Sequence, residues 1–248
     1  MTNPPARPDP PGRPAPAGRP RHVPLVGLLT FTSGCVDVVT LMTIGGTFTS
    51  VITGNLIIVG RAIGTSSLTP ALHVIMSVGG YILGVAAGSR LRLRLSRTPP
   101  GSPAPAWPRS ATLVLAAEWV LLAAVNVAWV SWRAAPPVAA DDVLLAAAAV
   151  ALGMQSAAAR AIRGNPSTTY MTGALTALVE ALATGGHRSA DASAALGLVT
   201  LVAGAACSAV LVVHAPATAL LPPLVSLLLV VAVKLRQHRR EAQLTQHG

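Results

Sequence analysis

The chain has 248 residues, of which 52% are apolar and 10% are charged, and its formal net charge is +10. This composition is typical of proteins that cross a membrane several times and argues against a soluble globular domain. The positive charge would also suit a nucleic-acid binder. The arginines, however, gather in the tails and at the ends of apolar runs, as membrane topology signals do, so we expect no nucleic-acid partner.

Both ends of the chain are polar. Residues 1–22 are rich in proline and arginine and predict a disordered tail, because they cannot bury enough apolar surface to order. The apolar run that follows lacks a cleavage-site pattern, so we expect no signal peptide. Residues 237–248 predict a basic, exposed tail, which leaves one membrane domain over residues 23–236.

Apolar runs of about 20 residues, the length that crosses about 30 Å of hydrocarbon as a helix, recur along this domain. The six predicted spans are Pro24–Ile44, Ala71–Ser89, Arg109–Val130, Asp142–Ile162, Ala190–His214 and Leu220–Leu235. The second span carries Gly80, Gly84 and Gly88 at four-residue spacing, which lets helix backbones approach closely in lipid. The sequence therefore predicts an all-α membrane protein.

Two shorter apolar segments interrupt this series, Phe48–Ile63 and Ser167–Ala183. The first contains Thr53-Gly54-Asn55 and the second contains Thr172-Gly173. Irregular backbone at membrane depth persists only where protein buries it or where it lines a wet cavity. We therefore predict two re-entrant or broken helices, whose hydroxyl and amide groups line a path for a small polar or ionic solute.

The two halves of the domain also register when the sequence is shifted by 119 positions. The matched pairs are Gly34 with Gly153, Gly45 with Gly164, Thr53 with Thr172, Gly54 with Gly173, and Leu56 with Leu175. The order of long and short segments matches as well. We therefore predict a structural repeat, with one copy over residues 23–132 and the other over residues 141–236.

The placement of basic residues bears on the number of spans. If the short segments do not cross, six spans place the N-terminal tail, the Arg90–Arg109 loop, Arg160, Arg163 and the C-terminal tail on one side, as the positive-inside rule requires. If they do cross, eight spans put that loop on the side opposite the N-terminal tail. We favour six spans with cytoplasmic termini, which makes the halves two inverted three-helix repeats, a plan that recurs in transporters.

Several polar residues inside the apolar runs are candidates for a site. Asp37 lies deep in the first predicted span, where an ionisable side chain costs about 2.5–3.5 kcal/mol and normally faces a partner or a cavity. It could bind a cation, relay a proton or contact a solute, or it could bond the end of a broken helix. Asn55 and Gln155 could share one cavity or bond between helices.

A second set of polar residues is less central. Glu118 and Asn126 lie two turns apart in the span Arg109–Val130 and form a possible second polar line. Arg61 and Glu180 occupy equivalent positions of the two halves. They could pair with each other, or they could lie separately at the membrane interfaces.

The motifs that would indicate an enzyme are missing. The chain has no H-E-x-x-H, no G-x-S-x-G and no G-x-x-x-x-G-K-[ST] pattern, and its six histidines are scattered. We therefore expect no catalytic activity, no cofactor and no metal. The sequence favours a channel or secondary transporter for a small solute, with a non-transporting membrane scaffold as the alternative.

Three stretches resemble a known family. They are GCVDVVTLMTIGGTFTSVITGNLIIVG, LGMQSAAARAI and TTYMTGALTALVEAL, and they resemble the motifs of the YoaK-like bacterial membrane proteins, domain of unknown function 1275. The likeness covers Val23 to Val233. It implies a multi-pass protein of the bacterial inner membrane with about six spans and no assigned activity. The motif residues that carry over are Asp37, Thr53, Gly54, Asn55, Gln155, Thr169, Thr172 and Gly173.

Overall fold

The computed structural model describes residues 22–96, 105–132, 137–162, 171–185 and 189–244. Its helices are α1 (Val23–Thr43), α2 (Ile52–Gly64), α3 (Leu68–Leu95), α4 (Arg109–Ser131), α5 (Val138–Ala159), α6 (Met171–Thr184), α7 (Ser189–His214), the short 3-10 helix η1 (Pro216–Thr218) and α8 (Leu221–Leu244). The predicted N-terminal tail, the break at Gly164 and the motif residue Thr169 lie outside the described residues. The part of the chain that is described contains no strand, which confirms the all-α prediction.

Six of the described helices, α1, α3, α4, α5, α7 and α8, are long and apolar enough to cross a membrane. The other two, α2 and α6, have 13 and 14 residues. At 1.5 Å per residue such helices extend only about 20 Å, well short of about 30 Å of hydrocarbon. The prediction of six spans is therefore confirmed, and the alternative with eight spans is not supported.

Two predicted helix ends fall short of the observed ones. The helix α3 continues through the Arg-Leu repeat to Leu95 rather than stopping at Ser89. The helix α8 continues to Leu244, through most of the residues predicted as a basic tail. Arginine, leucine and glutamine are good helix formers, so these helices can extend beyond their apolar windows as the side chains become charged.

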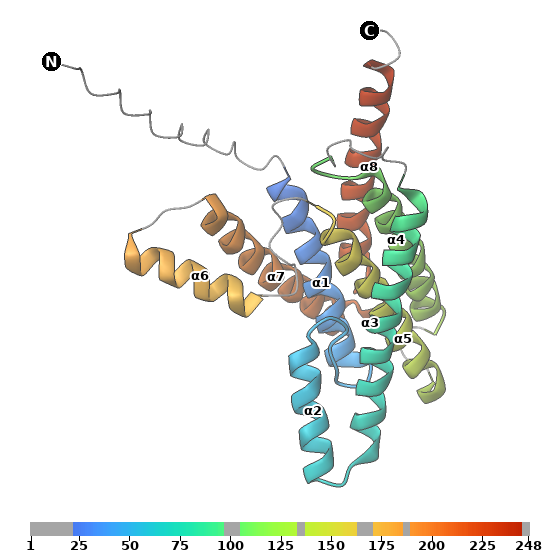
Figure 1. Ribbon diagram of the computed structural model, residues 1–248. Helices are drawn as coiled ribbons and strands as arrows, with labels where there is room; N and C mark the ends of the chain where they lie inside the picture. The colour runs from blue at the N-terminus through green and yellow to red at the C-terminus, as the bar shows by residue number, and fades with distance from the viewer. Residues whose placement is uncertain (1–21, 97–104, 133–136, 163–170, 186–188, 245–248) are drawn as a thin grey trace, which may run out of the picture.

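The helix ends gather at two ends of the bundle (Figure 1). The starts of α1 and α4 and the ends of α3 and α8 meet at one end, where Lys234 Nζ lies 3.0 Å from His22 Nδ1 and Ser96 Oγ lies 3.4 Å from Ser110 Oγ. This basic end carries Arg90, Arg92, Arg94, Arg109, Arg160, Lys234, Arg236, Arg239 and Arg240. The opposite end carries an acidic pair at the start of α5, Asp141 and Asp142, together with His73.

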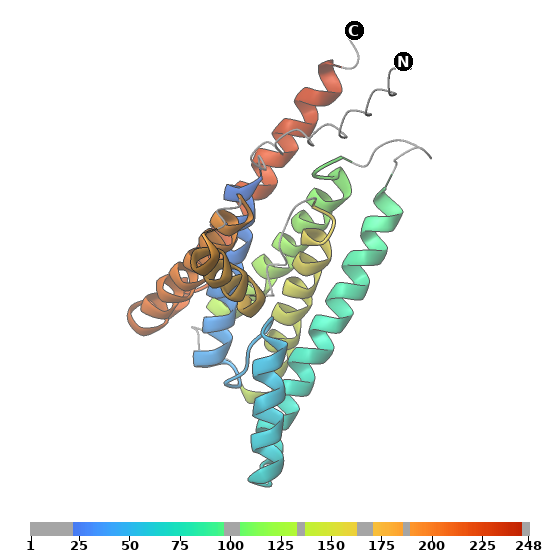
Figure 2. The same cartoon turned by 60° about the vertical axis from the view of Figure 1, so that its left-hand side comes forward.

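The bundle divides into two packed units (Figures 1 and 2). In the first unit, α3 packs against both α2 and α5, and α4 packs against α5. In the second unit, α7 packs against both α1 and α6, and α8 packs against α1. The first helix of the chain therefore leaves its sequence neighbours and joins the C-terminal half, and the two units meet where α4 faces α8 and α1 faces α5.

Glycines bring two pairs of helices into backbone contact. Where α1 crosses α7, a Cβ atom at Gly34 would lie 2.2 Å from the carbonyl oxygen of Leu201, and one at Gly204 would lie 2.2 Å from that of Phe31. Where α3 crosses α5, a Cβ atom at Gly84 would lie 2.1 Å from the carbonyl oxygen of Val150. Only glycine fits these crossings, as expected for close helix packing in lipid.

The α3–α5 crossing predicts a large effect of a single methyl group. We expect Gly84→Ala to lower the free energy of unfolding by about 1–3 kcal/mol or more, because the two backbones must separate to admit the Cβ atom. Thermal unfolding of the purified protein in detergent measures this change. Gly79→Ala is the matched control in the same helix, because a Cβ atom there meets nothing within 4 Å. Equal melting temperatures for the two variants would contradict the assigned packing.

Candidate functional site

The chain turns back into the bundle after α1. Gly45 and Gly46 have positive φ angles of 72° and 62°, which glycine adopts without strain, and they reverse the chain. Residues 44–51, here called the re-entrant loop, then run back along α1. This direction is shown by Asp37, which lies six residues before the end of α1 and yet bonds Thr49 and Ser50.

Asp37 holds the re-entrant loop through four hydrogen bonds. Its Oδ1 accepts from the Thr49 amide at 2.7 Å, from the Thr49 hydroxyl at 2.6 Å and from the Ser50 amide at 2.8 Å. Its Oδ2 accepts from the Ser50 hydroxyl at 2.5 Å. Asp37 is 5% exposed, and the two amides that donate to it belong to the buried loop before the N-cap of α2, where no helix bond is available to them. Its carboxylate is therefore occupied by the chain's own donors.

Asn55 holds the same loop from the other side. Its Oδ1 accepts from the Phe48 amide at 3.0 Å, and its Nδ2 donates to the Phe48 carbonyl at 2.7 Å, so one side chain satisfies both backbone groups of Phe48. The same Nδ2 reaches Ser77 Oγ of α3, which also donates to the Phe48 carbonyl. A Cβ atom at Gly54 would lie 3.1 Å from the Phe48 ring, so glycine permits this close approach.

These contacts give the first motif a structural role. The triplet Thr53-Gly54-Asn55 lies in the first turn of α2, so within the predicted short segment the irregular backbone is the loop before the triplet rather than the triplet itself. The physical reason is that Asn55 and Asp37 cap this backbone from two helices, which frees α2 to begin at Ile52. Of the two interpretations of Asp37, the geometry supports the bond to the end of a broken helix.

The second short segment does not join the first. Thr172 and Gly173 lie in the first turn of α6, Thr172 is exposed, and none of the described residues of α6 is buried. The helix α6 packs against α7 while α2 packs against α3, and the two short helices lie apart in both views (Figures 1 and 2). The structure therefore does not bring the two Thr-Gly segments and Asp37 around one path. Thr169 lies outside the described residues.

Gln155 instead lies where the two units meet. Its Nε2 donates to the Leu29 carbonyl at 3.0 Å and to Ser33 Oγ at 2.7 Å, which links α5 of the first unit to α1 of the second. The side chain is 1% exposed, and its Oε1 has no hydrogen-bond partner. Gln155 is thus half satisfied by helix-to-helix bonding, one of the two roles expected for it.

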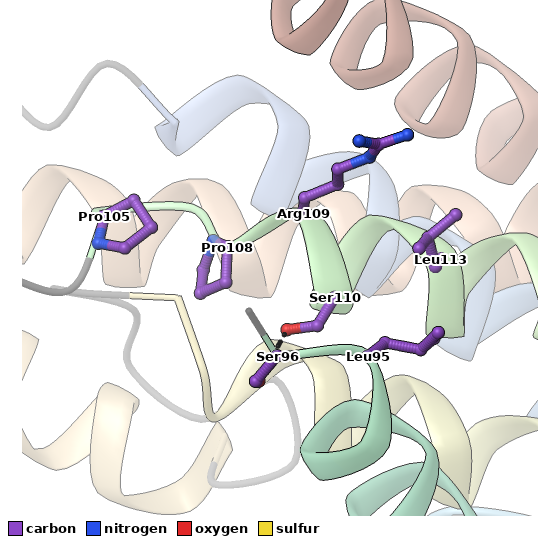
Figure 3. A pocket seen from close by; sticks show the side chains of 7 residues that line it. All are labelled: Leu95, Ser96, Pro105, Pro108, Arg109, Ser110 and Leu113. Carbon is purple, nitrogen blue, oxygen red and sulfur yellow. Dashed lines mark hydrogen bonds between the residues drawn. The ribbon is translucent and has the colours of Figure 1, made fainter. Parts of the chain in front are cut away.

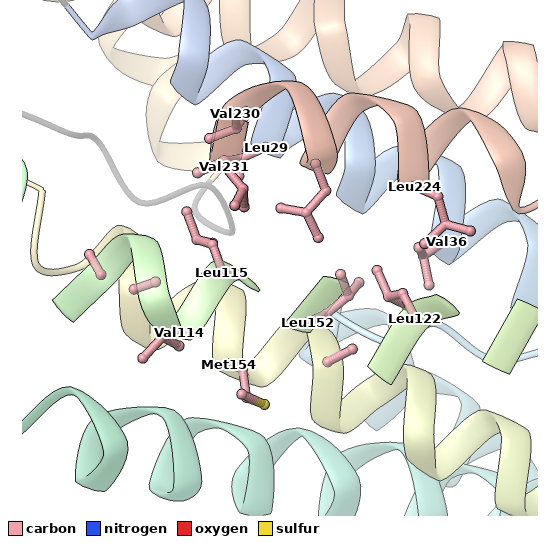
Figure 4. Close-up of a cluster of buried hydrophobic side chains, with 14 of the residues drawn as sticks. Leu29, Val36, Val114, Leu115, Leu122, Leu152, Met154, Leu224, Val230 and Val231 are labelled. Atoms are coloured by element: carbon pink, nitrogen blue, oxygen red, sulfur yellow. The ribbon is translucent and has the colours of Figure 1, made fainter. Parts of the chain in front are cut away.

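Glu118 lies in the same interface and has no hydrogen-bond partner among the residues that the structure describes. It is close to the middle of α4, is 0% exposed, and neither carboxylate oxygen has a hydrogen-bond partner. Leu115 and Leu122, one turn before and after it on the same helix face, pack in one cluster with Leu29 of α1, Leu152 of α5 and Leu224 of α8 (Figure 4). Glu118 therefore points into the apolar centre of the bundle.

The remaining candidates lie nearer the surface. Asn126 is half-buried on α4, and its Oδ1 also has no hydrogen-bond partner. Arg61 on α2 and Glu180 on α6 are both exposed, and these two helices lie apart. Of the two alternatives for Arg61 and Glu180, the structure shows separate placement at the surface rather than a direct pair.

A cavity of about 380 Å³ lies between the end of α3 and the start of α4 at the basic end (Figure 3). Its polar groups include the hydroxyls of Ser96 and Ser110, which bond each other. The side chain of Arg109 extends away from these two serines (Figure 3). The cavity therefore does not gather a set of groups that would bind a charged ligand.

Sequence reasoning did not single out the partners of the candidate residues. Ser50 and Phe48 stand in the stretch that carries the family resemblance, so their presence could have been used. Ser77 and Ser33 lie in ordinary apolar spans, and no local pattern distinguishes them from other serines. In the described parts of the chain, no group of three or more histidine, cysteine, aspartate or glutamate side chains could hold a metal ion.

Comparison with known proteins gives a consistent result. A family model described as "Protein of unknown function (DUF1275)" matches residues 25–233. The UPF0700 transmembrane protein YoaK of Bacillus subtilis (strain 168) is 31% identical over 157 residues, which cover 63% of this chain and 65% of YoaK. The match thus spans slightly less than two thirds of that relative's length. No solved structure matches the chain.

The hydrogen bonds of Asp37 lead to a prediction about stability. We expect Asp37→Ala to lower the free energy of unfolding by about 3 kcal/mol, because buried amides and hydroxyls of the re-entrant loop lose their acceptor. Thermal unfolding in detergent gives the change, and limited proteolysis should cut the variant within residues 44–51. Glu180→Ala removes an exposed carboxylate and should leave both results as in the wild type. Protection of the loop in Asp37→Ala would show that Asp37 does not hold it.

Proposed function

The chain belongs to the DUF1275 family of proteins of unknown function, and from its geometry we propose that it is a secondary transporter or channel for a small solute. The proposed path lies between the two packed units rather than along the two Thr-Gly segments. The observation that carries this proposal is the interface between the units, which holds Glu118 close to the middle of α4, buried and without a hydrogen-bond partner among the described residues. Intramembrane ionisable residues of this kind normally mark a route for solutes or protons.

Equivalent contacts in the two units support an inverted repeat. In the second unit, a Cβ atom at Gly34 would lie 2.2 Å from the carbonyl oxygen of Leu201. The matching contact in the first unit is between Gly153 and the carbonyl oxygen of Tyr81, at 2.3 Å. Gly204 against Phe31 matches Gly84 against Val150 in the same way. The matched residues of α1 and α5 lie 119 positions apart in the sequence, and the matched residues of α3 and α7 lie 120 positions apart. The two crossings therefore share one geometry.

The directions of the helices support the inversion. The helix α1 starts at the basic end, whereas its counterpart α5 starts at the opposite end. In the same way α4 starts at the basic end, with Trp107 beside Lys234, and its counterpart α8 ends there. The first unit thus combines α2, α3 and α4 of the first repeat with α5 of the second. The second unit combines α6, α7 and α8 of the second repeat with α1 of the first. Inverted repeats of this kind place the substrate site near the midplane, where the repeats meet.

The two kinds of contact suggest how the protein would move. Within each unit, one pair of helices touches backbone to backbone at glycine, α3 with α5 and α1 with α7, which leaves that pair little freedom to slide. Between the units, side chains make the polar contacts, for example from Gln155 to Ser33 and from Trp119 to the carbonyl of Leu224 at 3.0 Å. Side-chain contacts can change at lower cost than a glycine crossing. Rocking of one unit against the other is therefore the motion that the packing favours.

A second candidate function rests on the re-entrant loop. Both oxygens of Asp37 and the whole amide of Asn55 are used within the chain. Motif residues that serve only to hold a helix break are expected of a non-transporting scaffold or assembly partner. Glu118 favours transport, since a scaffold gains nothing from an unpartnered carboxylic acid in its centre.

We place the protein in the bacterial inner membrane with its basic end in the cytoplasm. Nine described arginine and lysine residues lie at that end, and the acidic pair Asp141–Asp142 lies at the other. Positive charge on the cytoplasmic side sets the orientation of multi-pass proteins. No nucleotide-binding pattern of the G-x-x-x-x-G-K-[ST] type occurs in the chain, so we propose that ion or solute gradients supply the energy.

Cross-linking the units tests the proposal. In a background with Cys35→Ala and Cys207→Ala, the pair Ser33→Cys and Gln155→Cys places one thiol on each unit. We expect a bifunctional methanethiosulfonate reagent, which joins the two thiols through disulfide bonds and releases sulfinate, to stop uptake by proteoliposomes, and a reducing agent that cleaves those disulfides to restore it. Uptake is followed with a panel of radiolabelled amino acids, carboxylic acids, sugars and inorganic ions, against empty liposomes.

The matched control lies within one unit. The hydroxyl oxygens of Thr32 and Ser226 are 3.2 Å apart, and both belong to the second unit. Joining Thr32→Cys to Ser226→Cys should leave uptake unchanged, because that unit moves as a whole. Uptake that survives the cross-link between units, or a complete lack of uptake across the panel, would favour the scaffold.

Orientation can be tested separately with reporter fusions. A fusion after Ser96, at the basic end, should leave alkaline phosphatase inactive and green fluorescent protein bright. A fusion at Pro137, which precedes α5 at the opposite end, should give the reverse. An active phosphatase after Ser96 would show that the basic end faces outward.

A further inference from the structure

We infer that Glu118 is a proton-binding site and that the transport proposed above is coupled to protons. This inference rests on the proposed function and gives the coupling ion for the same interface. In the closed arrangement described here, Glu118 carries its proton. When the units part and water enters, the O–H bond breaks, the proton passes to water, and the electron pair stays on the carboxylate.

The first step is the state of Glu118 in the closed bundle. The side chain is 0% exposed, and neither oxygen accepts a hydrogen bond. An ionised carboxylate without donors in an apolar interior is strongly disfavoured, and such a group takes up a proton instead. Asp37 is the contrasting case, because four donors surround it at 2.5–2.8 Å. The same chain thus holds one carboxyl group that is stabilised by donors and one that has none.

The second step concerns charged neighbours. Within the part of the chain that the structure describes, no ion pair involves Glu118, and the titratable and charged groups of the helices around it lie toward the ends of those helices or have other partners. These groups are His73, Tyr81, Arg90, Arg92 and Arg94 of α3, Asp141 and Asp142 of α5, Arg160 just after it, Lys234, Arg236, His238, Arg239, Arg240 and Glu241 of α8, and Cys35 and Asp37 of α1. No cation therefore replaces the proton in this arrangement.

The third step separates a proton from a metal cation. Hard cations such as Ca²⁺ and Mg²⁺ need six or more oxygen ligands, and Na⁺ makes a similar demand. The cluster that contains Leu115 and Leu122, the neighbours of Glu118 on its helix face, is formed by apolar side chains, most of them leucine, valine and alanine (Figure 4). Such surroundings supply too few oxygen atoms for a metal ion, whereas a proton needs only the carboxylate itself.

The fourth step concerns release. Glu118 belongs to α4 of the first unit, and the leucines beside it pack on Leu29 of α1 and Leu224 of α8, both in the second unit. Separation of the units therefore opens the surface that covers Glu118. Gln155, whose Oε1 is unpartnered, lies in the same interface and provides a second polar group for water or solute. The proton would thus exchange with water only when the path opens.

Labelling with dicyclohexylcarbodiimide tests the site directly. This apolar reagent reaches membrane-buried sites and reacts with protonated carboxyl groups to leave a stable adduct. In the full-length wild-type protein in liposomes, peptide mass spectrometry should find the adduct on Glu118, and the labelling rate should fall as the pH rises. We expect Glu118→Gln to lose this adduct, while Glu180→Gln, which removes an exposed membrane carboxylate, keeps it.

Stability gives a second measurement that does not depend on transport. If Glu118 is protonated when folded and ionised when unfolded, the folded state binds more protons near neutral pH, so stability falls as the pH rises. The melting temperature of the wild type should therefore fall between acidic and alkaline pH relative to that of Glu118→Gln. Parallel pH curves for the two proteins, or no adduct on Glu118, would overturn the inference.

The outcomes distinguish this inference from the proposed function. Protection from labelling by NaCl but not by choline chloride would assign Glu118 to Na⁺ and overturn the proton assignment. If cross-linking the units stops uptake but Glu118→Gln takes up solute as the wild type does, the proposed transport holds and the inference that Glu118 couples it to protons is overturned. If Glu118 is labelled and stability depends on pH as expected, but no solute is taken up, Glu118 is a proton-binding site and the proposed transport is overturned.

Discussion

Backbone contact at glycine is the constraint on which the rest of this structure depends. In a bilayer, apolar side chains gain little by packing against each other rather than against lipid, so helices associate best where small residues let their backbones meet. Gly34 and Gly204 serve this purpose between α1 and α7, and Gly84 and Gly153 serve it between α5 and α3. These crossings tie α1 to the C-terminal half and create two units whose shared interface is held by side chains.

That interface explains why two carboxyl groups of one bundle have different roles. Asp37 lies where the chain itself turns inward, and the buried amides of the loop just before a short helix donate to it. Glu118 lies where the two units touch, between Leu115 and Leu122, which pack in one apolar cluster with residues of α1, α5 and α8. A carboxylate that replaces missing helix bonds contributes to the fold. A carboxylic acid that receives no bonds reduces stability, so its presence is better explained by activity than by folding.

The re-entrant loop and the interface are also linked through α1. This helix carries Asp37 toward its C-terminal end and Ser33, the partner of Gln155, one turn earlier. Movement of α1 with the second unit would therefore act at once on the loop before α2 and on the contact with α5. The family motif, which combines the aspartate with the Thr-Gly-Asn triplet, holds the loop to the helix that would move.

Several features followed from the sequence because they depend on local properties. The length and apolarity of each run determine whether it can cross a bilayer, so six spans and two short helices could be predicted. The glycine pair that ends α1 and the four-residue glycine spacing of α3 are local as well. Helix ends were less certain, because the Arg-Leu repeat after Ser89 continues the helix although it leaves the apolar window.

The sequence by itself determined the class of protein, the number of spans and the candidate polar residues. Only the tertiary structure decided which of those residues are satisfied. Asp37 finds its donors 12 and 13 positions away, and Gln155 finds Ser33 122 positions away, whereas Glu118 finds none. The physical reason is that a hydrogen bond depends on which faces the packed helices turn toward each other. Helix pairing is set by glycine crossings between distant segments, which no local pattern records.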